Sequence, residues 1–114
     1  MNKLSLYDVE IENARKFRKE GNEGKARVCA RRAVGAVIRA GYDQNNTLQQ
    51  QNAMNLIRIM LEDGNLPMDV VAALEALIQR VTPQNEQDDL PDLIACAEIV
   101  ATYTLAHKFN AGFS

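Results

Sequence analysis

Apolar residues recur every three or four positions along almost the whole sequence, and strict alternation of apolar with polar residues never persists. The first spacing places apolar side chains on one face of an α-helix, whereas alternation is typical of a β-strand. Glycine, proline and cap-forming residues divide the pattern into amphipathic segments. We expect five helices at about residues 5–20, 22–40, 48–63, 67–82 and 91–108. Such segments with mostly short links predict a single all-α domain, an antiparallel bundle of about five helices.

The ends of these segments carry cap signals. Ser5 with Asp8 predicts a capping box at the first helix, and Gly21 predicts a left-handed end to that helix. Asn22 is a good cap for the second helix, which we expect to end at Gly41. For the third helix we expect a second capping box of Thr47 and Gln50 before it and Gly64 after it. For the fourth helix we expect Pro67 in the first turn and Pro83 beyond the end. For the fifth helix we expect Asp89 or Asp92 as the cap and a fraying tail from Asn110.

Each helix has one face that we expect to be buried. The five faces, in chain order, are Tyr7, Ile11, Ala14 and Phe17; Ala26, Ala30, Ala33, Val34, Val37, Ile38 and Ala40; Ala53, Leu56, Ile57, Met60 and Leu61; Val70, Val71, Leu74, Leu77, Ile78 and Val81; and Leu93, Ile94, Ala97, Val100, Ala101, Thr104 and Leu105. The small residues of the second helix allow another helix to approach closely. Gly35 costs about 1 kcal/mol against alanine in a helix, so a tight helix crossing best explains it.

The composition is that of an ordinary globular protein. The chain has 114 residues, of which 46% are hydrophobic and 25% are charged, and its net charge is −2. These values argue against disorder and fit one domain. No apolar run is long enough to span a membrane, and the N-terminus does not resemble a signal peptide. We therefore expect a cytoplasmic protein that makes no membrane contact.

The residue types that bind metals are too scattered to form a site. Cys29 and Cys96 stand singly within helical patterns, and with His107 they cannot make a four-ligand zinc site. We expect both cysteines to be reduced and buried. The acid pairs Glu62-Asp63 and Asp88-Asp89 lack the ligand spacing of a calcium loop. The sequence thus predicts no metal and no cofactor.

Charge is divided unevenly along the chain. Residues 1–41 hold ten basic and five acidic side chains, whereas residues 42–114 hold three basic and ten acidic ones. A basic half can mark a surface for nucleic acid. It can equally attract the acidic half, within one chain or between two copies. We favour the attraction between halves.

The stretch "EGNEGKARVCARRAVGAVIR" at residues 20–39 combines glycines, a lysine and a basic helix. A phosphate-binding P-loop needs two glycines five positions apart, then lysine and a hydroxyl residue, after a β-strand. Here Gly21 and Gly24 are three apart, Ala26 follows Lys25, and a helix precedes the loop. The sequence therefore predicts a turn between two packed helices.

This hairpin resembles two known families. The order Ala14, Phe17, Gly21-Asn22, Ala26 and Ala30 resembles a tetratricopeptide hairpin, although no second copy follows. The longer run "ARKFRKEGNEGKARVCARRAVGAVIRAGY", together with "LPDLIACAEIVATYTL", resembles the first two helices and the last helix of a HEPN domain. That resemblance implies a helical bundle.

HEPN ribonucleases carry an arginine, a spacer of four to six residues and a histidine near the last helix. Before His107, the arginine positions are occupied by Val100, Ala101 and Thr102. The resemblance therefore implies a member without the ribonuclease motif. Such members are associated with nucleotide binding or with pairing to a nucleotidyltransferase.

The second helix carries the residues that could bind nucleotide or nucleic acid, namely Lys25, Arg27, Arg31, Arg32 and Arg39. A row of guanidinium groups can hold phosphates, and Arg15, Lys16, Arg18 and Lys19 add a neighbouring patch. The alternative is a solvated or partner-facing surface, which suits the polar side of an amphipathic helix. Few aromatic residues lie nearby to stack bases.

The sequence thus predicts a non-enzymatic helical module that acts through protein contacts. Its expected partner is a second copy or another protein, with Met54, Met60 and Met68 among the candidate contact residues. The alternative is a HEPN-like protein that binds nucleotide or RNA through the basic helix. An enzyme hypothesis rests on His107 alone, and we assign no catalytic residue.

Overall fold

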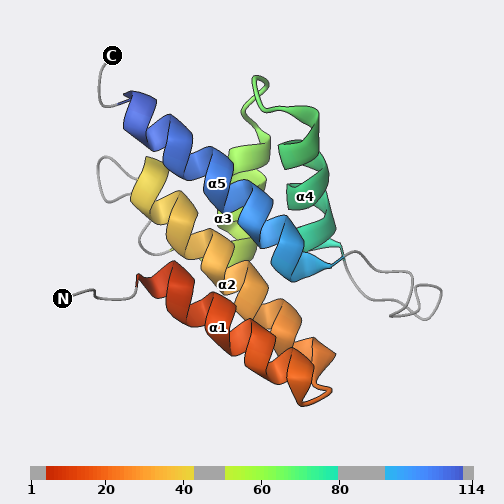
Figure 1. The fold of residues 1–114 in the computed structure, drawn as a ribbon. Coiled ribbons are helices and arrows are strands. Elements are labelled where there is room, and N and C mark those ends of the chain that lie inside the picture. Colours follow the sequence, from red (N-terminus) through yellow and green to blue (C-terminus); the bar gives the residue numbers. More distant parts are fainter. Residues whose placement is uncertain (1–4, 43–50, 80–91, 112–114) are drawn as a thin grey trace.

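The computed structural model of the chain describes residues 5–42, 51–79 and 92–111. Every regular element in these ranges is an α-helix, as Figure 1 shows. The helices are α1 (Leu6–Lys19), α2 (Glu23–Tyr42), α3 (Ala53–Leu61), α4 (Met68–Ile78) and α5 (Leu93–Ala111). The all-α bundle predicted from the apolar spacing is confirmed.

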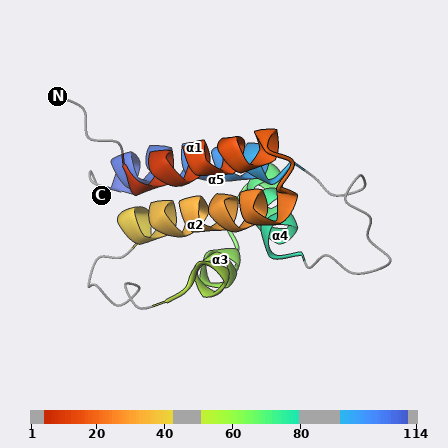
Figure 2. The same ribbon diagram turned by 90° about the horizontal axis from the view of Figure 1, so that it is seen from below.

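α2 is the central helix, because it packs against each of the other four. α1 and α5 lie on one side of α2, and α3 lies on the opposite side (Figure 2). α1 runs antiparallel to α2, whereas α5 runs alongside α2 in the same direction (Figure 1). α1 and α5 therefore both pack against α2, and they contact each other over a short stretch only.

Several predicted helix ends are confirmed by their hydrogen bonds. The Ser5 hydroxyl accepts from the Asp8 N–H at 3.1 Å, and the Asp8 carboxylate accepts from the Ser5 N–H at 3.3 Å. Gly21 adopts the left-handed conformation, with φ of +81°, after α1. The Asn22 side chain accepts from the Lys25 N–H at 3.1 Å, which caps α2. Asp89 and Pro83 lie outside the described residues.

Two helices are shorter than the sequence predicts. α3 begins at Ala53, not near Leu48, because Asn52 has extended backbone and its side chain caps the Asn55 N–H at 2.8 Å. The capping box expected of Thr47 and Gln50 lies outside the described residues. α4 ends at Ile78, since Gln79 turns to an extended backbone with ψ of 131°.

Two other helices are longer than predicted. α2 continues through Gly41 to Tyr42, and α5 continues through Asn110 to Ala111. Gly41 is thus a helical residue rather than a helix end. A Cβ added to it would lie 2.7 Å from Thr104 Cγ2. Glycine at this position lets α5 lie directly on the last turn of α2.

The buried core follows the predicted faces closely. Its confirmed members are Ile11, Ala14, Ala26, Ala30, Ala33, Val34, Val37, Ile38, Leu56, Ile57, Met60, Val70, Leu74, Leu77, Leu93, Ile94, Ala97, Val100, Ala101 and Thr104. Tyr7, Phe17, Ala53, Leu61, Val71 and Ile78 are partly buried. Val81 lies outside the described residues.

Two residues expected in the core, Ala40 and Leu105, are exposed. α1 begins only at Leu6, so it leaves the last turns of α2 and the facing part of α5 uncovered. The helical periodicity placed both residues on the correct faces, but α1 starts too late along the chain to cover them.

The predicted tight crossing at Gly35 is confirmed. A Cβ added to Gly35 would lie 3.2 Å from the Cβ of Ala53 and 3.3 Å from its Cα. This contact sets how closely α3 approaches α2.

Candidate interaction surfaces

Arg31 is a structural residue in this fold. Its Nε donates to the carbonyl of Leu77, and its Nη2 donates to the carbonyl of Gln79 at 3.3 Å. These carbonyls lie at the end of α4, where the helix itself supplies no partners. Partial burial, and then the charge of Arg27, lowers the pKa of the Arg31 guanidinium from its ordinary value. Arg31 thus fastens α2 to the end of α4.

Arg39 is likewise occupied by the backbone. Its Nη2 donates to the carbonyl of Gln51, just before α3 begins. Its Nε is buried and has no hydrogen-bond partner among the described residues. Two of the five predicted nucleotide-binding residues therefore hold neighbouring segments in place.

For the other three predicted binding residues, the described part of the chain shows no side-chain hydrogen bond to the backbone of a neighbouring helix. Lys25 and Arg32 are exposed and Arg27 is half-buried. The Lys25 ammonium lies 5.3 Å from the centroid of the Phe17 ring, a distance at which a cation is attracted to the ring face. Of the five predicted binding residues, Arg31 and Arg39 are therefore the two whose side chains are already bound to carbonyls.

The basic and acidic halves of the chain are joined by ion pairs between α1 and α5. Arg15 Nη2 lies 2.9 Å from Glu98 Oε2, and Arg18 Nη1 lies 2.9 Å from Asp92 Oδ1. Asp92 also accepts from the N–H groups of Ile94 at 3.0 Å and Ala95 at 3.2 Å. Asp92 therefore caps α5, and it is one of the two residues, Asp89 and Asp92, that were predicted for this role. Part of the charge division found in the sequence is satisfied within one chain.

Burial accounts for the properties of the cysteines. Cys29 and Cys96 are free thiols in the core. Burial raises the pKa of both thiols, with nearby Glu10 adding to the rise at Cys29 and Asp92 adding to it at Cys96. Both remain protonated near neutral pH and pack as small apolar side chains.

The remaining sequence candidates do not converge. Glu62 and Asp63 are exposed, and the Asp63 side chain accepts from the Asn65 N–H at 3.0 Å. Within residues 5–42, 51–79 and 92–111, no group of three or more histidine, cysteine or acidic side chains is placed to hold a metal. The side chain of His107 and the pair Asp88-Asp89 lie outside the described part. Of the three methionines, Met60 is buried, Met54 is half-buried and Met68 is exposed.

A first groove lies where α1 begins and α2 ends, and we call it the terminal groove. It has a volume of about 450 Å³ and is lined by Ser5, Leu6, Tyr7, Asp8, Ala36, Val37, Arg39, Ala40 and Leu105. Ala36, Val37 and Ala40 form its α2 wall. Leu6 and Leu105 are 58% and 55% exposed. The groove exists because α1 is shorter than α2 and leaves apolar surface uncovered.

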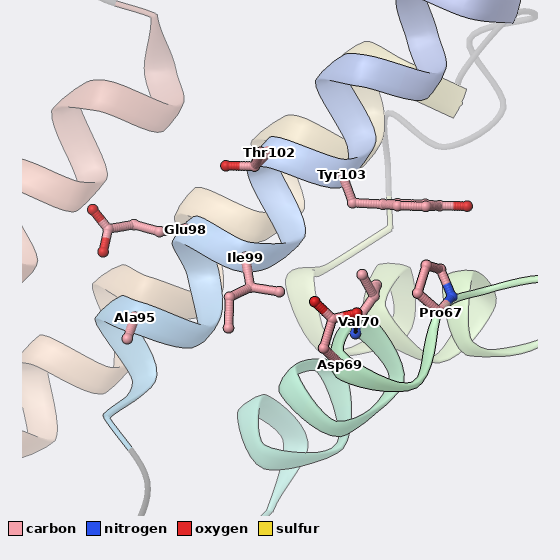
Figure 3. Close-up of a pocket in the computed structure, with 8 residues that line it drawn as sticks. All are labelled: Pro67, Asp69, Val70, Ala95, Glu98, Ile99, Thr102 and Tyr103. Atoms are coloured by element: carbon pink, nitrogen blue, oxygen red, sulfur yellow. Dashed lines mark hydrogen bonds between the residues drawn. The ribbon is translucent and has the colours of Figure 1, made fainter.

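A second groove lies between the start of α4 and the outer side of α5, and we call it the α4–α5 groove. It has a volume of about 530 Å³. Its lining residues are drawn in Figure 3 and are Pro67, Asp69, Val70, Ala95, Glu98, Ile99, Thr102 and Tyr103. Burial, and then the charge of Asp63, raises the pKa of the Tyr103 phenol. The phenol is therefore neutral near pH 7.

Neither groove is evident from the pattern of apolar residues in the sequence. Leu6 and Ile99 are large apolar residues that lie outside the predicted buried faces, and Met68 is similarly isolated. Such off-face residues are the sequence signal that could have pointed to exposed apolar surface. Their grouping around grooves depends on how the helices pack.

Comparison of the chain with protein-family models, with curated proteins and with solved structures gave no significant match. The HEPN resemblance therefore stays a prediction from the sequence. In the part of the chain that the structure describes, none of the helices combines the length and apolar character needed to cross a membrane.

Proposed function

We propose that this chain is a non-enzymatic helical module that acts through protein contacts and pairs with a second copy of itself at the terminal groove. The observation that carries the proposal is the exposed apolar surface gathered there. Leu6 and Leu105 border the uncovered end of α2. Exposed leucines grouped around a groove are typical of an interaction surface. We also propose a cytoplasmic location, which suits two free cysteines.

The shape of the groove favours a second copy as the occupant. Leu6 and Leu105 are large and exposed, whereas Ala36 and Ala40 are small and leave room for an incoming side chain. A patch that carries both kinds of residue can match itself across a two-fold axis. Burying one leucine side chain fully contributes about 1.5–3 kcal/mol, so four leucines across a symmetric pair would contribute substantially.

The decisive test is the molar mass in solution, measured by size-exclusion chromatography with light scattering. We expect the wild-type chain to be a dimer at micromolar concentration. Leu105→Glu should give a monomer, because pairing would bury its charge. Leu6→Glu should also give a monomer, and an acid in the first turn of α1 is favoured by the helix dipole.

Ile59→Glu is the matched control. Ile59 is a large apolar residue on α3 that is 38% exposed and does not line the terminal groove. This variant should remain dimeric, and circular dichroism should show unchanged helix content in all three variants. A monomeric wild-type chain, or a dimer that survives both groove substitutions, would refute the proposal.

Binding of nucleotide or RNA through α2 has weaker geometric support. Arg31 and Arg39 are bound to backbone carbonyls, which leaves Lys25, Arg27 and Arg32 for phosphates. An RNA affinity that falls steeply with salt and that weakens in the Arg27→Ala, Arg32→Ala double variant would favour this alternative.

A further inference from the structure

We infer that the α4–α5 groove is the docking site for a basic amphipathic helix of another protein. The inference concerns a different surface from the terminal groove and does not depend on self-pairing. It rests on three features of the groove, which are its apolar centre, the sign of the charges around it and its helical walls.

The centre of the groove is apolar. The side chain of Ile99 extends from α5 into the space facing the first turn of α4, where Val70 lies (Figure 3). Ile99 is 38% exposed, and Met68, the residue before Asp69, is 88% exposed. Ile99 thus lines a groove of about 530 Å³, and Met68 adjoins the lining residues Pro67 and Asp69 in the sequence. An apolar side chain of a partner in this groove would remove Ile99 from water.

The charged residues that line the groove are both acidic. They are Asp69 on α4 and Glu98 on α5. One Glu98 oxygen is paired with Arg15, but Asp69 has no ion-pair partner within the described residues. Asp63 adds negative charge beside Tyr103.

The segments that form the groove walls, together with α3, are mostly acidic. Residues 51–79 and 92–106 carry six acidic side chains and a single basic one, Arg58. Complementary charge steers association and selects partners. The partner that this surface fits is therefore basic.

The walls of the groove favour a helical partner. Ala95, Ile99 and Thr102 lie at positions i, i+4 and i+7 along α5 and line one side of the groove. A helix can lay apolar residues spaced by three or four positions along such a row. Lysine or arginine on either side of these anchors would then reach Asp69 and the free oxygen of Glu98.

A second copy of the chain is a less suitable occupant. On α2 of such a copy, the exposed stripe that could enter the groove has two basic residues, Lys25 and Arg32, with Val28 between them. This stripe offers one apolar anchor, Val28, which is 43% exposed. An amphipathic helix with two or more large apolar anchors would cover more of Ile99 and Met68.

The test uses two synthetic helical peptides that share the same leucine positions. One carries lysine on its polar face, and the other carries glutamate. Fluorescence anisotropy of each labelled peptide is measured against the full chain. We expect the lysine peptide to bind and the glutamate peptide not to bind.

Variants locate the bound peptide. Asp69→Asn keeps a side-chain acceptor for the Val70 N–H, which Asp69 Oδ1 now binds at 2.9 Å, but it removes the charge. It should weaken binding about threefold to tenfold, and Ile99→Ala should weaken it as well. Glu75→Gln is the matched control, since Glu75 is an exposed acid on α4 that does not line the groove. It should bind like the wild type.

Three outcomes would overturn the inference. The first is no binding of the lysine peptide to the wild-type chain. The second is an equal loss in Asp69→Asn and Glu75→Gln, which would indicate unspecific charge attraction. The third is assembly beyond a dimer that Asp69→Asn abolishes, which would make a second copy the occupant. Leu105→Glu should bind the peptide normally, so failure of self-pairing is distinguishable from failure here.

Discussion

Neighbouring arginines of the same helix have different roles in this protein. Arg31 is half-buried and donates to the carbonyls of Leu77 and Gln79, whereas Arg32 is exposed. Their sequence context is nearly identical, and the helical rotation of about 100° between them decides which one meets α4. At this scale, a basic residue in the sequence indicates a charge but not its partner.

This difference predicts unequal costs for two alanine substitutions. Arg31→Ala removes charged hydrogen bonds to one partly buried and one exposed carbonyl and should lower the free energy of unfolding by about 1–2 kcal/mol. Arg32→Ala should change it by less than about 0.5 kcal/mol. Urea unfolding followed by circular dichroism measures both values. Equal losses would mean that the Arg31 contacts contribute nothing to stability.

Two glycine residues of α2 set how closely other helices pack against it. Gly35 brings α3 onto α2 and Gly41 brings α5 onto the end of α2. Gly24 lies in the first turn of the same helix, where an added Cβ would meet only the Asn22 side chain, at 3.8 Å. The same residue type therefore serves a crossing at one position and is unnecessary at another.

Gly35→Ala and Gly24→Ala should change stability in opposite directions. Alanine is favoured over glycine within a helix by about 1 kcal/mol, so Gly24→Ala should raise the thermal midpoint. At Gly35 the new methyl group would meet the Ala53 backbone at 3.3 Å, and overpacking typically costs about 1–3 kcal/mol. Gly35→Ala should therefore lower the midpoint. A higher thermal midpoint in both variants would show that α3 moves to accommodate the added methyl group at little cost.

The charge division of the whole chain is partly used to hold α1 and α5 together. Arg15 pairs with Glu98 and Arg18 with Asp92, across more than 70 residues of sequence. Partial burial alone would raise the pKa of Asp92. The hydrogen bond from the Ala95 N–H, and then the hydrogen bond and charge of Arg18, outweigh burial and hold that pKa below its ordinary value.

A lowered pKa in the folded state makes the contribution of Asp92 depend on pH. The contribution is fully present above the unfolded value, near pH 3.9, and is lost as the pH falls through the lower folded value. At neutral pH the free energy of unfolding of the wild type should exceed that of Asp92→Asn by up to about 1 kcal/mol. The difference is small because the ion pair with Arg18 is exposed. Asparagine keeps the cap, so the variant isolates the charge.

The measurement is urea unfolding of both chains between pH 7 and pH 2. The difference in unfolding free energy should stay constant down to about pH 5 and shrink below it. All other acids titrate in both chains and cancel from the difference. A difference that is independent of pH would exclude an electrostatic contribution from Asp92.

The sequence predicted the features that depend on near neighbours in the chain. The capping box of Ser5 and Asp8, the left-handed Gly21 and the cap at Asp92 involve atoms within a few residues, so local pattern was sufficient. The predicted third helix began too early because asparagine at position 52 is also a strong cap. Choosing between nearby caps requires knowing where the packed part of the helix begins.

The candidate surfaces could not be predicted in the same way. Ala40 and Leu105 lie on the correct helical faces, yet they border a groove because α1 starts too late to cover them. Ile99 and Asp69 are 30 residues apart and meet only where α4 packs against α5.

The helices, their caps and most of the buried faces could therefore be predicted without coordinates, since they follow from the periodicity of residues that are close along the chain. Which arginines bind carbonyls and which apolar residues remain exposed became clear from the packed helices alone. Both depend on where one helix ends relative to another, and that relation is set by packing between segments distant in the sequence.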